Sequence, residues 1–372
     1  MGVLQTSPVR KGLSRQVGLV KPLMLSVLIV ASVGYAIYGD TGSNTGIGAS
    51  ATGSGNKPAV HRIPDPLFGI DIDEGGVGIV TGYYGTIIAR NGDQQSWEYR
   101  DSHTDELIRR VDVVSSSAVW AVGHRGSLMH SDDGGYQWQS AHRQPGIYLR
   151  DVAFATEQVG WAVGHDATIL STRDGGQTWQ TQTLDGWTGR DKPRLHAVTV
   201  VDEQNAIIVG EFGVVAVTEN GGELWSLVPG SDRSTWTAAD HVNGRVIAVG
   251  LDGNALALEL STKQVEKIKT GIKRHLFDVS LRSDGSGYLV GVAAILAING
   301  TDITQPNVDS NVELPYTWLH GVKALEDGGA IAVGAGGLMV ELDRTSSAFS
   351  RVAHPRSASR SVSLSSINGG EH

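Results

Sequence analysis

The sequence predicts an all-β chain that folds as a seven-bladed β-propeller. Three observations predict it. The chain holds 49 glycines among 372 residues and only 19% of its residues are charged, a composition typical of many turns between strands rather than of long helices. A short apolar run that ends in Val-Gly or Thr-Gly recurs seven times. Each recurring unit divides into four strand-like segments, which is the content of one propeller blade.

The recurring glycine marks units of similar length. Its copies are spaced by 41, 41, 46, 40, 41 and 43 residues, at Gly82, Gly123, Gly164, Gly210, Gly250, Gly291 and Gly334. Three residues before each glycine stands a large apolar side chain: Ile79, Trp120, Trp161, Ile207, Ile247, Tyr288 and Ile331. Three residues after it stands Gly or Ala: Gly85, Gly126, Ala167, Gly213, Gly253, Ala294 and Gly337. Seven such sheets in a ring bury the faces that a single sheet exposes, so we expect one propeller over residues 59–355.

The third unit shows the four strands in order. The alternating segment "LRDVAFA" (149–155) suits the innermost strand, and "VGWAVG" (159–164) is the second. The third and fourth strands are "TILSTR" (168–173) and "WQTQTL" (179–184).

The residues before the propeller differ in kind. Four basic residues precede the uncharged run Pro22–Tyr38, whose seventeen residues are close to the shortest length that spans a bilayer. The basic flank predicts that residues 1–38 comprise a cytoplasmic stub and a membrane anchor, with the propeller exported to the periplasmic side of the cytoplasmic membrane. A cleaved signal peptide, with Gly34 and Ala36 as the small residues of its site, and a buried core helix are the alternatives. Residues 39–58 are expected to be a flexible linker and the tail 356–372 to be disordered.

Composition excludes several classes of site. The chain has no cysteine, so disulfides, thiolate metal sites and thiol nucleophiles are absent. Its formal net charge of −9 argues against a general surface for nucleic acid or anionic membrane. We expect no cofactor, no catalytic residue and no nucleic-acid partner.

A second motif recurs between the third and fourth strands of three units. It reads "SDDGGYQW" (131–138), "TRDGGQTW" (172–179) and "TENGGELW" (218–225). Asp and Gly favour a tight turn, and the ligand spacing of an EF-hand is missing, so a structural turn is favoured over a calcium site. We expect the three tryptophans to be buried against the neighbouring blade. The motif residues are Ser131, Asp133, Gly135, Trp138, Thr172, Asp174, Gly176, Trp179, Thr218, Asn220, Gly222 and Trp225.

This motif resembles the Asp box, or bacterial neuraminidase repeat. Together with "GWAVG" and the period of forty-one residues, it makes residues 62–353 similar to the photosystem II stability/assembly factor-like propeller family. The resemblance implies a non-enzymatic propeller that binds an integral membrane protein. Photosynthetic members use an arginine-rich surface to assist a reaction-centre subunit, and relatives from other bacteria are found with RND-type transporters. The chain has no cysteine for lipidation, which favours the transporter-accessory role over a photosystem role.

The candidate partner-binding residues come from positions that the blade geometry places on one face. These positions are the second residue of each inner strand, the turn after each Val-Gly, and the insert 185–194 before the fourth unit. They concentrate basic and aromatic side chains: Arg109, Arg110, Arg150, Arg194, His196, His124, Arg125, His165, Trp187, Arg190 and His320. Two alternatives remain open. The arginines form a solvated rim paired with acids such as Asp151, or three histidines (124, 165 and 196) hold a metal. The favoured interpretation has no metal.

A sialidase-like glycoside hydrolase is the alternative from another class. "HRIP" (61–64) matches the Arg-Ile-Pro start of sialidases, which also carry Asp boxes. That enzyme needs further arginines, a Tyr–Glu pair and an acid Asp around one pocket, and only Arg62 can be assigned. Sialidases also have six blades, whereas seven units are present here.

Overall fold

The computed structural model describes residues 65–92, 96–143, 146–343, 345–353 and 355. Several predicted features lie outside these residues: the apolar run 22–38, the linker 39–58, Arg62 and the tail 356–372. Within the described part of the chain, no helix combines the length and the apolar character that crossing a membrane requires.

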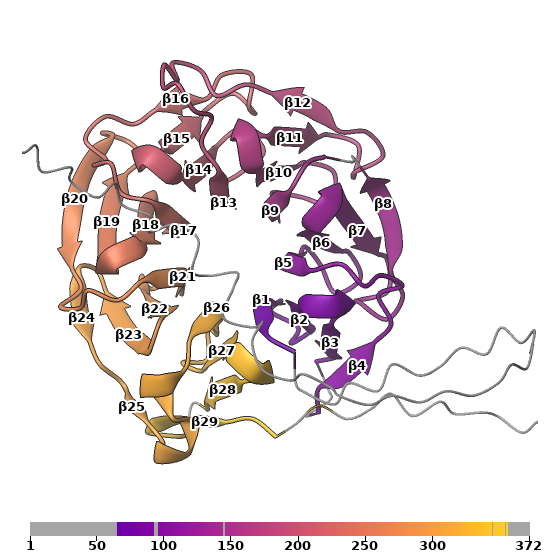
Figure 1. Ribbon diagram of the computed structural model, residues 1–372, viewed down its shortest axis with the longest axis vertical. Helices are drawn as coiled ribbons and strands as arrows, with labels where there is room; N and C mark the ends of the chain where they lie inside the picture. The colour runs from indigo at the N-terminus through magenta and orange to yellow at the C-terminus, as the bar shows by residue number, and fades with distance from the viewer. Residues whose placement is uncertain (1–64, 93–95, 144–145, 344, 354, 356–372) are drawn as a thin grey trace, which may run out of the picture. The chain divides into compact units, whose positions relative to one another are not determined.

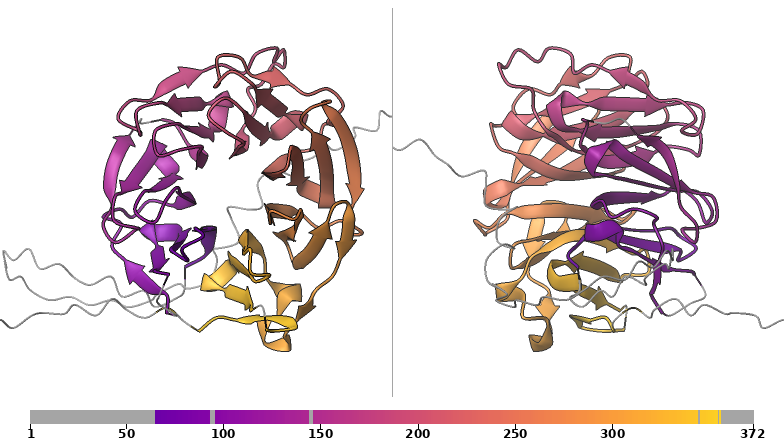
Figure 2. Two further views of the ribbon diagram at one scale, coloured as in Figure 1. Left: turned by 180° about the vertical axis from the view of Figure 1, so that it is seen from behind. Right: turned by 45° about the vertical axis from the view of Figure 1, so that its right-hand side comes forward.

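The described residues form seven antiparallel sheets that radiate around a central axis, which confirms the seven-bladed propeller (Figure 1). Seen from behind and at an angle, the sheets follow one another around the ring in chain order (Figure 2). Blade 1 is β1 (Leu67–Ile72), β2 (Gly78–Gly82), β3 (Ile87–Arg90) and β4 (Glu98–Arg100). Blade 2 is β5 (Ile108–Val113), β6 (Val119–Gly123), β7 (Ser127–Ser131) and β8 (Gln139–Arg143). Blade 3 is β9 (Leu149–Phe154), β10 (Gly160–Gly164), β11 (Ile169–Thr172) and β12 (Gln180–Gln182).

The other four blades follow the same plan. Blade 4 is β13 (Leu195–Val200), β14 (Ala206–Gly210), β15 (Val215–Thr218) and β16 (Ser226–Leu227). Blade 5 is β17 (Trp236–Val242), β18 (Arg245–Gly250), β19 (Asn254–Glu259) and β20 (Gln264–Lys269). Blade 6 is β21 (Leu276–Leu281), β22 (Ser286–Gly291), β23 (Ala294–Asn299) and β24 (Asp302–Thr304). Blade 7 is β26 (Leu319–Ala324), β27 (Ala330–Gly334), β28 (Met339–Leu342) and β29 (Ala348–Arg351), with β25 (Asn307–Val308) added in parallel to β29.

Short 3-10 turns follow the second strand in six blades. They are η1 (Tyr83–Gly85), η2 (His124–Gly126), η3 (His165–Ala167), η4 (Glu211–Gly213), η5 (Leu251–Gly253) and η8 (Ala335–Gly337). Two more, η6 (Ser310–Val312) and η7 (Leu314–Tyr316), precede β26. Because the start of each inner strand pairs with the end of the second strand, as Leu67 does with Gly82, these turns lie at the end of the blade where the inner strand begins. We call this end the mouth face.

The Val-Gly glycine is explained by a close approach of two backbones. A Cβ at Gly123 would lie 2.0 Å from the carbonyl oxygen of Leu107, the residue before the inner strand of the same blade. That carbonyl accepts a hydrogen bond of 3.0 Å from the N–H of His124. The same bond joins Tyr148 to His165 in blade 3, and corresponding bonds occur in the other five blades. The glycine therefore lets the inner strand and the turn share one carbonyl.

The large apolar residue three positions earlier fills the space between blades. Trp120 of blade 2 is buried and stacks on Phe154 of blade 3, with ring centroids 5.0 Å apart. The Asp-box glycine Gly176 of blade 3 lies so close that a Cβ there would be 2.1 Å from the Trp120 ring. The large apolar residue of one blade therefore packs closely against the Asp-box turn of the next blade.

The Asp box is a turn, as expected. In blade 2 the N–H of Gly135 donates to Ser131 Oγ at 2.9 Å, and the N–H of Gln137 donates to Asp133 Oδ1 at 2.8 Å. Blades 3 and 4 repeat these bonds around Thr172 and Thr218.

The expected burial of the three Asp-box tryptophans is correct for two of them. Trp138 and Trp225 are buried, but Trp179 is half-buried. Trp179 meets Trp120 and Phe154 edge-on at 5.9 and 6.0 Å. Those two rings already fill the space between blades 2 and 3, so the Trp179 ring stays at its outer edge.

The ring closes through side chains. Blade 1 is built only from residues 67–100 and blade 7 mainly from residues 319–351, so no described strand is exchanged between the first and last blades. Leu67 and Ile70 of blade 1 share one apolar cluster with Val333 and Met339 of blade 7. This seam buries apolar area like the other junctions between blades.

Candidate functional site

The second residue of every inner strand lies in a β-bulge. In each blade the pairing between the inner and second strands shifts register at this residue. A bulge leaves the residue unpaired and re-aims its side chain. The seven residues, which we call the mouth ring, are Phe68, Arg109, Arg150, His196, Thr237, Phe277 and His320.

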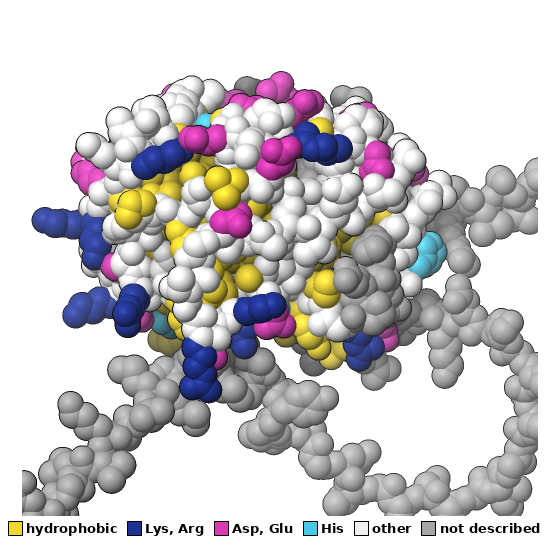
Figure 3. Space-filling view, turned by 90° about the horizontal axis from the view of Figure 1, so that it is seen from above, with side chains coloured by type: hydrophobic (Ala, Val, Ile, Leu, Met, Phe, Trp, Pro, Cys, Tyr) yellow, Lys and Arg dark blue, Asp and Glu magenta, His cyan; other side chains and the backbone are white. Residues whose placement is uncertain are grey.

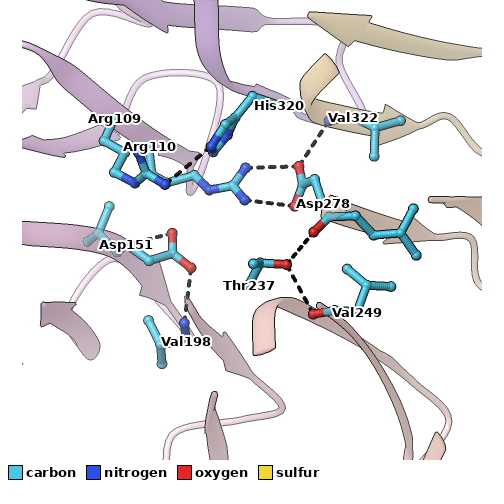
Figure 4. Close-up of polar contacts among 11 residues, drawn as sticks. Arg109, Arg110, Asp151, Val198, Thr237, Val249, Asp278, His320 and Val322 are labelled. Carbon is cyan, nitrogen blue, oxygen red and sulfur yellow. Dashed lines mark hydrogen bonds and ion pairs between the residues drawn. The ribbon is translucent and has the colours of Figure 1, made fainter. Parts of the chain in front are cut away.

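On one side of the mouth ring, Arg109 is held by aromatic and imidazole rings. Its Nη2 donates to Nε2 of His320 at 3.2 Å, and its guanidinium lies 5.8 Å from the centroid of the Phe68 ring. The His320 ring stacks on Phe277 with centroids 5.1 Å apart and is buried. Residues of blades 1, 2, 6 and 7 therefore meet here, partly shown in Figure 4.

Arg150, on the next inner strand, makes the corresponding contact with its own blade. Its Nη1 donates to Nε2 of His165, in η3, at 3.2 Å. Burial, followed by the nearby Arg194, lowers the pKa of Arg150 to about 10. Burial and the charge of Arg150 also lower the pKa of Arg109 well below its ordinary value.

The imidazoles beside these arginines are neutral at pH 7. Burial, followed by Arg109, lowers the pKa of His320 well below 6.5, and burial followed by Arg150 does the same for His196. Burial and Arg150 lower the pKa of His165 to about 4. The unprotonated nitrogen of a neutral imidazole can accept a hydrogen bond from a guanidinium N–H, which explains the two Arg–His hydrogen bonds.

Arg110 is not on the mouth face, contrary to the sequence prediction. Because side chains alternate along a strand, Arg110 turns into the channel, where it is buried. It makes two bonds of 2.8 Å to the carboxylate of Asp278, which comes from the sixth blade (Figure 4). Burial alone lowers the pKa of Arg110, but Asp278 outweighs this effect and raises it.

Below the mouth ring the channel holds a polar cavity of about 240 Å³. Its charged lining residues are Asp71, Arg110, Asp112, Asp151, Asp240, Asp278 and Lys323. Each of the five carboxylates accepts a backbone N–H from the inner strand of the following blade. The pairs are Asp71 with Val113, Asp112 with Phe154, Asp151 with Val198, Asp240 with Leu281 and Asp278 with Val322. The carboxylates therefore bind neighbouring blades together around the axis.

The rim alternative requires the arginines to pair with acids such as Asp151. Asp151 forms no such pair with Arg109 or Arg150. Its carboxylate accepts the N–H groups of Val152 and Val198 at 3.0 Å each. Burial raises the pKa of Asp151 to about 6, against the opposing charge of Arg110.

Three predicted arginines lie on turns and connections of the mouth face. Arg125 is 3.0 Å from Glu106, and Arg194 is 3.4 Å from Glu211. Arg190 is exposed and lies 3.8 Å from Asp191. The turn residue His124 packs edge-on against Tyr148, with centroids 5.5 Å apart.

The insert before blade 4 adds an aromatic pair. Trp187 stacks on Phe212 with centroids 6.0 Å apart, and its Nε1 donates to the carbonyl of Asp191. Phe212 is 50% exposed and has a φ of 58°, in the left-handed region that bulky residues avoid. Tyr84 in η1 is likewise exposed with a φ of 52°. The same φ recurs at this turn position at Arg125, Asp166 and Asp252, so it belongs to the repeated turn, and it is the exposure of the two aromatic rings that makes them candidates for a contact surface.

The rim shows how charge is distributed outside the mouth. Figure 3 views the outer side of the ring, and in it most Lys and Arg side chains lie toward the lower and left edges, while Asp and Glu are densest along the upper edge. Basic side chains therefore gather locally on an acidic protein.

The metal alternative finds no support in the described residues. No group of three or more His, Asp or Glu side chains there has the arrangement of a metal site. The second position of the inner strand correctly indicated which residues form the mouth ring. The two phenylalanines at this position were not among the candidate site residues predicted from the sequence. Phe68 and Phe277 hold the mouth ring together, and only their shared position could have indicated this.

One family model matches the chain. It is described as photosynthesis system II assembly factor YCF48 and matches residues 142–235, which span blades 3 and 4 and the insert between them. No curated protein sequence matches the chain.

Solved structures share the fold at low identity. A structure titled "YCF48 bound to D1 peptide" has 16% identity and a TM-score of 0.59, covering 75% of this chain and 94% of its own. YCF48 from Cyanidioschyzon merolae has 18% identity and a TM-score of 0.61, covering 76% and 96%. A GH74 enzyme from Niastella koreensis has 13% identity and a TM-score of 0.63, covering 78% of this chain but only 54% of the enzyme. The family model and the shared ring support the resemblance that the repeats suggested: over residues 142–235 the chain is similar to the photosystem II assembly factor family, and its ring has the fold of the YCF48 structures.

Proposed function

We propose that this propeller is a non-enzymatic binding scaffold that assists an integral membrane protein complex as an assembly or accessory factor. The observation that carries the proposal is the match of residues 142–235 to the YCF48 model, because this segment includes Arg150, His165 and the Trp187 insert of the mouth face. A structure of YCF48 with a D1 peptide supports a peptide-binding role for propellers of this type.

The mouth face has the chemistry of a recognition surface. It combines exposed aromatic side chains, which are common at the centre of interfaces, with arginines that give orientation and specificity. A segment of the partner that carries apolar and acidic side chains would complement it.

The partner that we propose is an RND-type transporter or one of its associated proteins. This follows from the resemblance and from the missing lipidation cysteine. The residues 22–38 would anchor the chain and leave the propeller on the periplasmic side. A photosystem assembly factor is the second candidate, favoured by the description of the matching family model.

Co-purification tests the proposal. The full-length chain, extracted in mild detergent, is expected to retain a membrane protein that mass spectrometry identifies. The triple variant Arg109→Gln, Arg150→Gln, Arg194→Gln should lose that protein while keeping its thermal midpoint of unfolding. The matched control is Lys263→Gln, Lys267→Gln, Lys269→Gln on and beside β20, which removes the same charge from the rim. Equal capture by both variants would contradict a role for the mouth face.

The hydrolase alternative is tested separately. A sialidase requires a six-bladed ring, whereas the described residues form seven sheets. Turnover of a fluorogenic sialoside that is lost on Arg62→Ala would contradict the scaffold proposal.

A further inference from the structure

The two arginines of the mouth ring differ from the other cations around the channel. Four cations have a carboxylate within ion-pair distance: Arg110 with Asp278, Lys323 with Asp71, Arg125 with Glu106, and Arg194 with Glu211. Arg109 and Arg150 have none among the described residues. Their hydrogen-bond partners in that part of the chain are the imidazoles of His320 and His165. The acids that act on them from a greater distance are engaged elsewhere: Asp151, near Arg109, accepts two backbone N–H groups, and Glu211, near Arg150, pairs with Arg194.

Polar atoms without partners gather at the same place. Arg150 Nε, His196 Nε2 and His320 Nδ1 are buried and make no hydrogen bond to any described residue. A buried polar atom left without a partner costs about 1–3 kcal/mol, and such atoms usually have one. His320 is only 7% exposed, and its packing against Phe68 and Phe277 fixes its ring. Taken as whole residues, Arg109, Arg150 and His196 are only partly buried, so part of each residue is open to solvent although the unpartnered atoms themselves are covered.

We propose that the mouth ring binds one oxyanion, a carboxylate or phosphate-type group, between the guanidinium groups of Arg109 and Arg150. A guanidinium presents N–H donors in a fork that matches two oxygens of such a group. The neutral His196 can add one further N–H donor. The bound charge offsets the repulsion between two positive groups that no carboxylate neutralises.

This inference deepens the proposed function and rests on it only for the biological source of the anion. A carboxylate would come from the partner's segment, whereas a phosphate or sulfate would come from solution. Small anions alone test the site, so its failure and the failure of partner capture are distinguishable.

The experiment is a titration of the full-length chain in detergent with sodium sulfate, sodium phosphate and an N-acetylated tripeptide. It is followed by the thermal midpoint at constant ionic strength, with sodium chloride as the reference. Binding to the folded state alone raises the midpoint with ligand concentration. The tripeptide is compared with its C-terminal amide, which lacks the charge. The double variant Arg109→Gln, Arg150→Gln should weaken the apparent affinity at least about tenfold, the loss expected for charged hydrogen bonds. Lys267→Gln, an exposed cation of β20 outside the mouth ring, should leave it unchanged.

Either arm supports the site if its effect depends on the two arginines, and the arms distinguish the sources. A response to the tripeptide acid but not to its amide assigns a peptide carboxylate, and a response to sulfate or phosphate alone assigns a free anion. The inference is overturned if no oxyanion raises the midpoint above the chloride reference. It is also overturned if the double variant responds as the wild type does. Because each variant is compared with its own chloride reference, a change in intrinsic stability does not disguise the result.

Discussion

Arg110 of the second blade and Asp278 of the sixth form a two-bond ion pair across the axis of the ring. Both side chains are about one-tenth exposed. Asp278 also accepts the N–H of Val322 from blade 7, so this pair ties blade 2 to the sequence-distant blades 6 and 7.

Removing one member of this pair should destabilise the propeller. Arg110→Met leaves a buried carboxylate uncompensated, and the free energy of unfolding is expected to fall by about 3–5 kcal/mol. Urea denaturation measures this change. The double variant Arg110→Met, Asp278→Asn should lose less than the sum of the single losses, because it removes both charges. Strict additivity of the two single changes would show that the residues do not interact.

The Val-Gly glycine should resist substitution by alanine. Gly123→Ala places a methyl group against the Leu107 carbonyl, and a loss of about 3 kcal/mol is expected because two backbones must separate. Gly75→Ala is the control, since its new Cβ would be no closer than 3.4 Å to Asp73. Comparable unfolding midpoints for the two variants would refute the close-approach explanation.

Histidine 165 should make stability fall on acidification. Its pKa is about 4 in the folded chain, against an ordinary value of 6.5. Between these values the unfolded chain binds a proton that the folded chain does not, so His165 reduces stability as pH falls from 7 toward 4. In His165→Gln the thermal midpoint should fall less between pH 7 and pH 5, and the glutamine can still accept from Arg150. A pH dependence identical to that of the wild type would contradict the assignment.

The buried carboxylates of the channel should act in the opposite direction. Burial raises the pKa of Asp240 to about 6, against two backbone hydrogen bonds. The folded chain therefore binds a proton more tightly than the unfolded one. The resulting stability is complete below about pH 4 and is lost as pH rises through about 6. Asp240→Asn should flatten that component in melting curves recorded from pH 4.5 to 7.5. A steeper loss of stability with rising pH in the variant would contradict this role of Asp240.

The turn role of the Asp box predicts indifference to calcium. In blade 4, Asn220 Oδ1 already takes the place of the carboxylate and accepts the N–H of Leu224 at 3.0 Å. Asn220→Asp should change stability by less than about 1 kcal/mol, because the acceptor is kept. Neither calcium nor a chelator should shift the thermal midpoint of the wild type or the variant. A calcium-dependent rise that disappears in Asp133→Asn would instead indicate a metal site.

The propeller could be predicted from the sequence because the same local motif recurs seven times. Each Val-Gly marks a backbone approach within its own blade, and each large residue three positions earlier fills one junction. The Asp box could be interpreted for the same reason, since its hydrogen bonds span at most four residues.

The candidate site could be predicted only in part. Arg109 and Arg110 are neighbours in sequence, but the bulge and the alternation of the strand send one to the mouth and the other to Asp278, 168 residues away. The burial of Trp179 was overestimated because Trp120 of the neighbouring blade stacks on Phe154 of Trp179's own blade and occupies the space between the blades. Both outcomes depend on the partner blade, which the local pattern does not contain.

The seam between blades 1 and 7 gives the ring a built-in weak joint. At the other six junctions the polypeptide itself runs from one blade into the next and limits how far they can part. Among the residues that the structure describes, apolar packing and side-chain bonds such as Lys323 to Asp71 are what resists separation of β1 and β26. Local unfolding on heating and cleavage by proteases should therefore begin at this junction. The ring also cannot close until its last blade has been synthesised.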